Sequence, residues 1–207
     1  MTAKLVATLS LVAVIGWSAS ASAAGSVEAG QAKSATCMAC HGADGNSPNP
    51  EWPNLAGQHA SYFEQQIQAF KSGNRKNDLM TPMAMILSDE DVADLAAYFA
   101  AQKIRGGEAE PSKVTLGEQV YRAGKVDAGV MACAGCHGPT GRGNPLAAYP
   151  SIQGQHATYV AAQLKAYRAG ARYDDPTPVH YQMMRGVAMG LTNEEIEAVA
   201  SYVQGLR

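Results

Sequence analysis

The sequence lacks three features that would point to common classes of protein. Its longest apolar run, over residues 5–17, is about 13 residues long, which is short of the roughly 20 that a membrane-spanning helix needs. It contains no run of lysine or arginine that would suggest a nucleic-acid partner. No stretch alternates apolar and polar residues as a half-buried strand would. These absences favour a helical protein that neither crosses a membrane nor binds nucleic acid.

Cysteine is also scarce, and its placement is informative. All four cysteines fall in two copies of one pattern, Cys37-Met38-Ala39-Cys40-His41 and Cys133-Ala134-Gly135-Cys136-His137. Cys-x-x-Cys-His is the attachment signal for a c-type haem. The two thiols bond to the vinyl groups of one haem, and the histidine binds the iron as the proximal ligand. The sequence therefore predicts two covalent haems, held by Cys37, Cys40, His41, Cys133, Cys136 and His137.

Two other uses of these cysteines have to be weighed against haem. A disulfide between Cys37 and Cys40 would close a very small loop and would leave the histidine that follows unexplained. Four cysteines and two histidines could bind zinc, but a histidine directly after a cysteine is unlike ordinary zinc spacing. Because the five-residue signal is repeated intact, haem is the favoured interpretation.

The N-terminus predicts export. Lys4 precedes the apolar run. Small residues follow the run and end in Ala21-Ser22-Ala23, a cleavage site of the A-x-A type. We therefore expect residues 1–23 to be a signal peptide and the mature chain, beginning at Ala24, to be soluble. Covalent haem on an exported chain indicates a bacterial periplasm.

The remaining sequence is one unit of about 100 residues used twice. The segment PNLAGQHA at 53–60 returns as PSIQGQHA at 150–157, and LSDE at 87–90 returns as LTNE at 191–194. Between the copies, residues 105–112 contain two glycines and a proline and are typical of a linker. This predicts a first domain at 24–107 and a second domain at 108–207.

Apolar residues recur at helical spacing in both units and predict a middle and a last helix in each. Ser88 and Thr192 precede acidic residues and predict the caps of the two last helices. The apolar positions are Phe63, Ile67, Phe70, Val92, Leu95 and Phe99 in the first unit and Val160, Leu164, Tyr167, Ile196, Val199 and Val203 in the second.

A shorter helix is expected before each haem motif, around 27–33 and 116–123, where Gly30 and Gly117 would allow a close crossing of the last helix. The fold class is therefore all-α, with two small helical domains in tandem. Each domain is too short to bury a large core. We expect each to be wrapped around its haem and to depend on it for folding.

The second axial ligand of each iron decides between an electron carrier and a catalyst. Met80 and Met184 each lie eight residues before the cap of the last helix, and Met85 and Met189 each lie three residues before it. A methionine is expected because His/Met is the usual pairing in small cytochromes c. The repeat leaves both pairs open.

Other side chains compete for roles near the haem. We expect His59 and His156, which precede the middle helices, to lie at the surface or to cap. His180 occurs in an insertion of the second unit and is predicted to lie in a loop. Arg75 and Arg172 recur in both units and either approach the haem propionates or are ordinary solvated arginines.

The chain resembles the cytochrome c4 family, di-haem proteins built from two class I cytochrome c domains, over its whole mature length. The resemblance is carried by the two haem motifs, the paired Pro-x-(Leu/Ile)-x-Gly-Gln segments and the paired segments from methionine to cap. It implies that Met80 and Met184 are the iron ligands. It also implies that the carbonyls of Pro53 and Pro150 accept the Nδ1–H of the proximal histidines.

The resemblance further implies a monomeric periplasmic carrier with one electron per haem, and not an enzyme. Its partners would be a respiratory donor complex and a terminal oxidase or reductase, or a copper protein. Two alternatives remain. A di-haem peroxidase would leave one iron without a methionine, whereas both units keep one. A haem subunit that docks on a membrane dehydrogenase or oxidase needs no spanning segment of its own.

Overall fold

The computed structural model of the chain describes residues 25–172 and 179–207, so the predicted signal peptide lies outside the described residues. Within these ranges every regular element is a helix, accompanied by two isolated β-bridges. The all-α prediction is confirmed. No helix in the described ranges is both long enough and apolar enough to span a bilayer.

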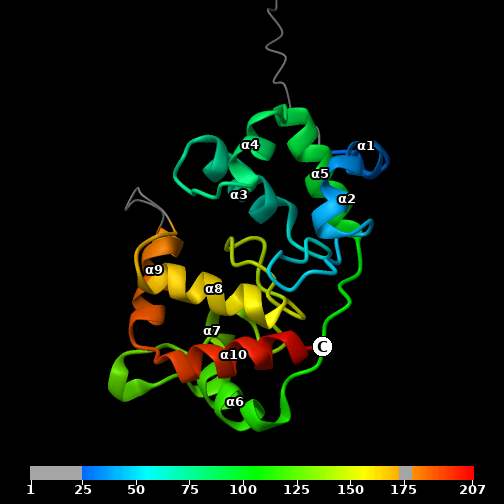
Figure 1. The fold of residues 1–207 in the computed structure, drawn as a ribbon. Coiled ribbons are helices and arrows are strands. Elements are labelled where there is room, and N and C mark those ends of the chain that lie inside the picture. The colour runs from blue at the N-terminus through cyan, green and yellow to red at the C-terminus, as the bar shows by residue number, and fades with distance from the viewer. Residues whose placement is uncertain (1–24, 173–178) are drawn as a thin grey trace, which may run out of the picture.

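The chain forms two helical domains in sequence, which lie above and below one another in Figure 1. A stretch without helix, residues 103–110, runs between them. The first domain contains α1 (Val27–Lys33), α2 (Ala35–His41), α3 (Ala60–Lys71), α4 (Met80–Met85) and α5 (Asp89–Ala101). The second contains η1 (Pro111–Lys113), α6 (Val114–Ala123), η2 (Val126–Ala128), α7 (Ala134–His137), α8 (Ala157–Arg168), α9 (Val179–Met189) and α10 (Asn193–Gly205).

A glycine in the first α-helix of each domain lets the backbone of that helix lie directly against the backbone of the last helix. A Cβ added to Gly30 in α1 would lie 2.0 Å from the carbonyl oxygen of Asp94 in α5. A Cβ on Gly117 in α6 would lie 2.3 Å from the carbonyl oxygen of Ala198 in α10. The predicted close crossings are therefore confirmed in both domains.

The predicted caps start both last helices. Ser88 Oγ accepts the backbone N–H of Asp91 at 3.1 Å, and the Asp91 carboxylate accepts the N–H of Ser88 at 2.9 Å. Thr192 and Glu195 make the same reciprocal pair at 3.2 and 2.8 Å. Each pair satisfies two backbone N–H groups that a helix start would otherwise leave without a partner.

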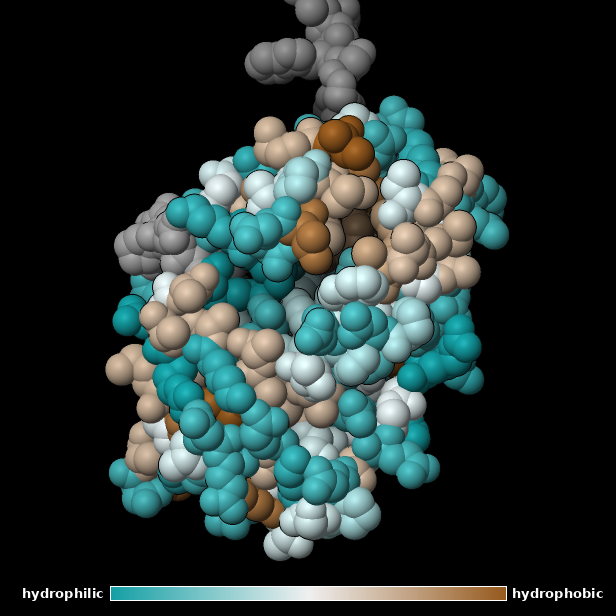
Figure 2. Space-filling view, viewed as in Figure 1, coloured by the Kyte–Doolittle hydropathy of each residue, from teal (hydrophilic) through white to brown (hydrophobic). Residues whose placement is uncertain are grey.

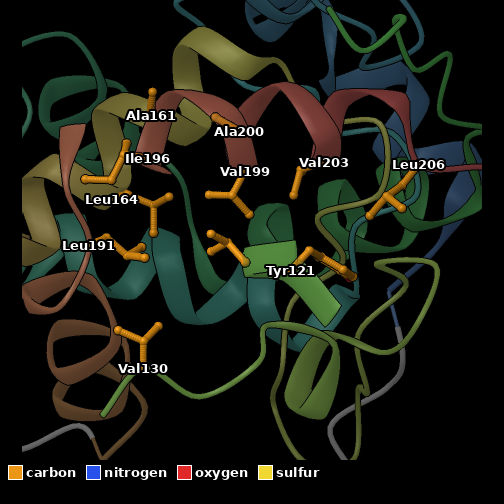
Figure 3. Packing of buried hydrophobic residues seen from close by; sticks show 11 residues of the cluster. Tyr121, Val130, Ala161, Leu164, Leu191, Ile196, Val199, Ala200, Val203 and Leu206 are labelled. Carbon is orange, nitrogen blue, oxygen red and sulfur yellow. The ribbon is translucent and has the colours of Figure 1, made fainter. Parts of the chain in front are cut away.

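Each domain has one apolar core, formed on the inward face of its last helix. Leu95 and Phe99 in α5 are fully buried, and the Phe99 ring packs on Phe63 with centroids 5.7 Å apart. In the second domain Ile196, Val199 and Val203 project from the same side of α10 (Figure 3). Burying one such side chain contributes about 1.5–3 kcal/mol to folding. The helical spacing read from the sequence thus marks the core, although Val160 and Tyr167 are only partly buried.

We expect Gly117→Ala to destabilise the second domain by about 1–3 kcal/mol, because its Cβ would force α6 away from α10. Chemical denaturation followed by circular dichroism measures this. The matched control is Gly186→Ala in α9, where an added Cβ meets nothing within 4 Å. That variant should be neutral or stabilised by up to about 1 kcal/mol. Equal effects of the two substitutions would contradict the crossing geometry.

Candidate haem sites

A cavity of about 780 Å³ extends into both domains. Its walls include apolar side chains such as Phe63, Leu95 and Val199. Figure 2 shows hydrophobic side chains gathered beside a hollow in the upper half of the molecule. The cavity is also lined by every residue of the two predicted attachment sites, namely Cys37, Cys40, His41, Cys133, Cys136 and His137.

The four cysteines are free thiols and half-buried, so the disulfide alternative is not realised. Burial raises the pKa of the Cys133 thiol to about 11 and raises that of Cys37 as well. Both are therefore neutral at physiological pH. In the described part of the chain no three side chains of His, Cys, Asp or Glu are grouped so that they could hold a metal ion. The zinc alternative thus gains no support from the geometry.

The two motif histidines have the same environment. His41 ends α2 and His137 ends α7, and both are buried. Nδ1 of His41 lies 2.9 Å from the carbonyl oxygen of Pro53, and Nδ1 of His137 lies 2.9 Å from that of Pro150. A carbonyl oxygen can only accept, so Nδ1 carries the proton and donates. The predicted hydrogen bonds are confirmed.

These bonds leave Nε2 of each ring with its lone pair free to bind a metal. Burial lowers the pKa of both His41 and His137, although the bond to the proline carbonyl opposes this shift. Each imidazole is therefore neutral, which is the form that ligates iron.

A glycine after each motif turns the chain back toward the histidine. Gly42 and Gly138 follow the two histidines with φ of 78° and 75°, a conformation that suits glycine because it has no Cβ. Each ends its helix by donating its backbone N–H to a carbonyl four residues earlier. The chain then folds beneath the ring, which brings Pro53 to His41 and Pro150 to His137.

Five methionines line the cavity, and two of them, Met80 and Met184, occupy equivalent places in the repeat. Met80, at the start of α4, and Met184, within α9, are half-buried and belong to the cavity wall. Met85 and Met189 are 60% and 63% exposed and are not part of the wall. Of the two pairs that the sequence left open, only the first therefore faces the haem sites.

The segments that carry these methionines are both helical. The side chain of Asn77 starts α4, because its Oδ1 accepts the backbone N–H of Met80 at 2.8 Å. In the second domain α9 already begins at Val179 and extends to Met189. The prediction that His180 lies in a loop is therefore wrong. Its ring packs edge-on against Tyr149, with centroids 5.3 Å apart. Residues 173–178 of the predicted insertion lie outside the described residues.

His59 and His156 do not cap helices with their side chains, contrary to one expectation. Each occupies the N-cap position of α3 or α8 without a side-chain cap bond. Their rings instead reach the opposite domain. His59 Nε2 lies 2.8 Å from the carbonyl oxygen of Arg142, and His156 Nε2 lies 2.9 Å from that of Ser47.

The recurring arginines also lie between the domains. Arg172 is only 4% exposed, so the solvated alternative is wrong for it. Arg75 donates to Gln66 Oε1 at 2.8 Å and to the hydroxyl of Tyr159, in the other domain, at 2.9 Å. Both guanidinium groups line the cavity. Sequence reasoning did not identify this contact between domains.

Comparison with known proteins decides the family. The sequence model of the Cytochrome c family matches residues 27–103 and 114–207. The chain is 48% identical to cytochrome c4 of Pseudomonas aeruginosa over 198 residues, which covers 96% of this chain and 97% of that protein. The chain belongs to the cytochrome c4 family. It is a di-haem c-type cytochrome that takes part in electron transfer.

Two further relatives agree with the fold and the function. The crystal structure of reduced recombinant cytochrome c4 from Pseudomonas stutzeri superposes with a TM-score of 0.84 at 49% identity, over 89% of this chain and all of that one. A protein named thiosulfate dehydrogenase electron acceptor, from Stutzerimonas stutzeri, is 36% identical over 80% of this chain and 76% of its own length.

The cavity fits two haems by the chemistry of its walls. In each domain the two motif thiols, the motif imidazole with its free Nε2 and the thioether of Met80 or Met184 line the same apolar space. These are the groups that a covalent haem with His/Met ligation requires.

We expect replacement of Cys37 and Cys40 together by serine to remove one of the two haems, because serine cannot form the thioether. The apolar wall around Phe63 and Leu95 would then face water, and the first domain should lose helicity and thermal stability. Absorption spectra and circular dichroism measure both effects. Met85→Leu, at an exposed position outside the cavity, is the control. Unchanged helicity in the serine variant would contradict a structural role for the haem.

Proposed function

We propose that this member of the cytochrome c4 family is a periplasmic electron carrier that holds one electron on each haem. It would pass electrons from a respiratory donor complex to a terminal oxidase or reductase. The observation that supports this most directly is the placement of a thioether, Met80 or Met184, on the same cavity as each proximal histidine. If the imidazole and the thioether both bound the iron of their haem, no position would remain for a substrate.

We assign the attachment and ligand roles residue by residue. His41 and His137 would be the proximal ligands, and Met80 and Met184 the opposite ligands. The first domain would span residues 24–107 and the second 108–207, after removal of a signal peptide at 1–23. The thioether bonds to the two haems would come from Cys37, Cys40, Cys133 and Cys136.

The bound haem supplies a reversible change between ferrous and ferric iron. The chain's own residues set where that equilibrium lies. A soft thioether favours the reduced state relative to a second histidine. The apolar walls act in the same direction, because the oxidised site carries one more positive charge that water would otherwise solvate. Arg75 and Arg172 add positive charge beside the cavity, which suits the carboxylates of the haems.

We also propose a class of electron donor. A quinol-oxidising complex would suit a carrier of this kind, and a copper protein is an alternative partner. The relative from Stutzerimonas stutzeri is named as the electron acceptor of a thiosulfate dehydrogenase. That name favours a dehydrogenase as a second class of donor. We further propose that the carrier is a monomer and does not itself catalyse a reaction.

We expect Met80→His and Met184→His each to abolish the charge-transfer band between thioether and ferric iron at one haem. Each should also lower the midpoint potential of that haem, because histidine favours the ferric state more than methionine does. Absorption spectra and redox titration measure these changes. The controls are Met85→His and Met189→His, which should keep both bands. Loss of a band in a control, with retention in Met80→His or Met184→His, would contradict the assignment.

We expect the two haems to have different midpoint potentials, because the domains differ around them. Among the described residues, only the second domain has an edge-on pair of rings on its cavity wall, Tyr149 and His180, and it also contains the 3-10 segment Val126–Ala128. A redox titration should show two transitions. One transition with equal midpoints would contradict this expectation. High-spin ferric haem together with peroxide turnover at neutral pH would instead favour the peroxidase alternative.

A further inference from the structure

Two equivalent glutamines bind the backbone of the opposite domain. Gln155 Oε1 accepts the N–H of Asn54 at 2.8 Å, and Gln155 Nε2 donates to the carbonyl oxygen of Asn54 at 2.9 Å. Gln58 makes the same pair of bonds to Ser151, at 3.0 Å from the N–H and 2.9 Å to the carbonyl oxygen. The two contacts are related by the repeat and together join the domains reciprocally.

The orientation of each glutamine amide is fixed by a third bond. Oε1 of Gln58 also accepts the backbone N–H of His59 at 3.0 Å, and Oε1 of Gln155 accepts that of His156 at 3.0 Å. If either amide were turned over, its NH2 group would face two N–H donors. The oxygen therefore points at both N–H groups.

Each of these contacts ends on the peptide group that holds a proximal histidine. The N–H of Asn54 belongs to the same peptide group as the carbonyl of Pro53, which accepts Nδ1–H of His41 at 2.9 Å. The N–H of Ser151 likewise shares its peptide group with the carbonyl of Pro150, which accepts from His137 at 2.9 Å. One peptide group thus connects the histidine of one domain with the glutamine of the other.

Hydrogen bonds in such a chain strengthen one another. When the N–H of a peptide group donates, its carbonyl oxygen becomes more negative and accepts more strongly. The effect is largest where water is excluded, and Asn54 and Gln155 are only 4% and 8% exposed. A stronger acceptor at Nδ1–H makes the imidazole a better electron donor through Nε2.

We propose that each glutamine is a positioning residue for the proximal histidine of the opposite domain, so that Gln155 tunes His41 and Gln58 tunes His137. Through this contact each domain influences the reduction potential of the haem in the other domain. This inference rests on the proposed role of His41 and His137 as iron ligands.

The variants Gln155→Met and Gln58→Met test it, because methionine keeps the length of the side chain and removes its hydrogen bonds. We expect Gln155→Met to raise the midpoint potential of the first-domain haem more than that of the second, since His41 would become a weaker donor. Gln58→Met should give the mirror result. Redox titration followed by NMR of the haem methyl resonances measures each haem separately.

His59→Phe is the matched control. It removes a hydrogen bond between the domains, to the carbonyl of Arg142, that does not involve either proline peptide. It should shift neither haem selectively. If a glutamine variant shifts the haem of its own domain more, or both haems equally, or neither, the inference is overturned.

A measurement on the unaltered holoprotein does not depend on how the variants fold. The amide protons of Asn54 and Ser151 should exchange slowly with solvent, and rapid exchange would overturn the inference. The proposed function fails in a different way. Absence of the His/Met spectrum in the unaltered protein would reject the ligand assignment before any titration is made.

Discussion

The bond from Nδ1 of each motif histidine to a proline carbonyl is the constraint from which the rest of both sites follows. At 2.9 Å in each domain it fixes the tautomer and the plane of the ring, and it leaves Nε2 with a free lone pair on a histidine that lines the cavity. The covalent motif alone would tether a haem without determining how strongly the histidine donates to the iron. The turn that follows α2 and α7 brings that carbonyl to the histidine. A glycine with positive φ starts the turn in both domains.

The duplicated domains share the features that hold the proximal side and differ in those around it. Both have the glycine crossing, the capped last helix and the proline carbonyl. On the opposite side α4 has six residues and α9 has eleven. Among the described residues, only the second domain has an aromatic pair near the proximal ring: Tyr149 and His180 pack edge-on, and the ring centroids of Tyr149 and His137 lie 6.5 Å apart. Any difference between the haems therefore arises outside the features that the two domains share.

The sequence predicted the features that depend on local spacing. The caps at Ser88 and Thr192 and the apolar faces of the helices follow from residues within a few turns of one another. It could not choose between Met80 and Met85, because burial is a property of the folded chain. Nor did it find the contact between Gln58 and Ser151, whose residues lie 93 positions apart. The only signal was that glutamine recurs at 58 and 155 in both copies of the repeat.

The recurrence of glutamine has a physical reason in the peptide groups that these side chains bind. A duplicated domain that functioned alone would need no partner for the N–H of Asn54 beyond water. Here that N–H is buried and bound by the other domain, and leaving it without a partner would cost about 1–3 kcal/mol. Separation of the domains would therefore expose polar groups next to both histidines at once. The same glutamine bonds stabilise the interface and polarise the proline carbonyls. Association of the domains is therefore coupled to the reduction potentials of the haems. The pair of domains, rather than either one, is the unit whose redox behaviour the chain specifies.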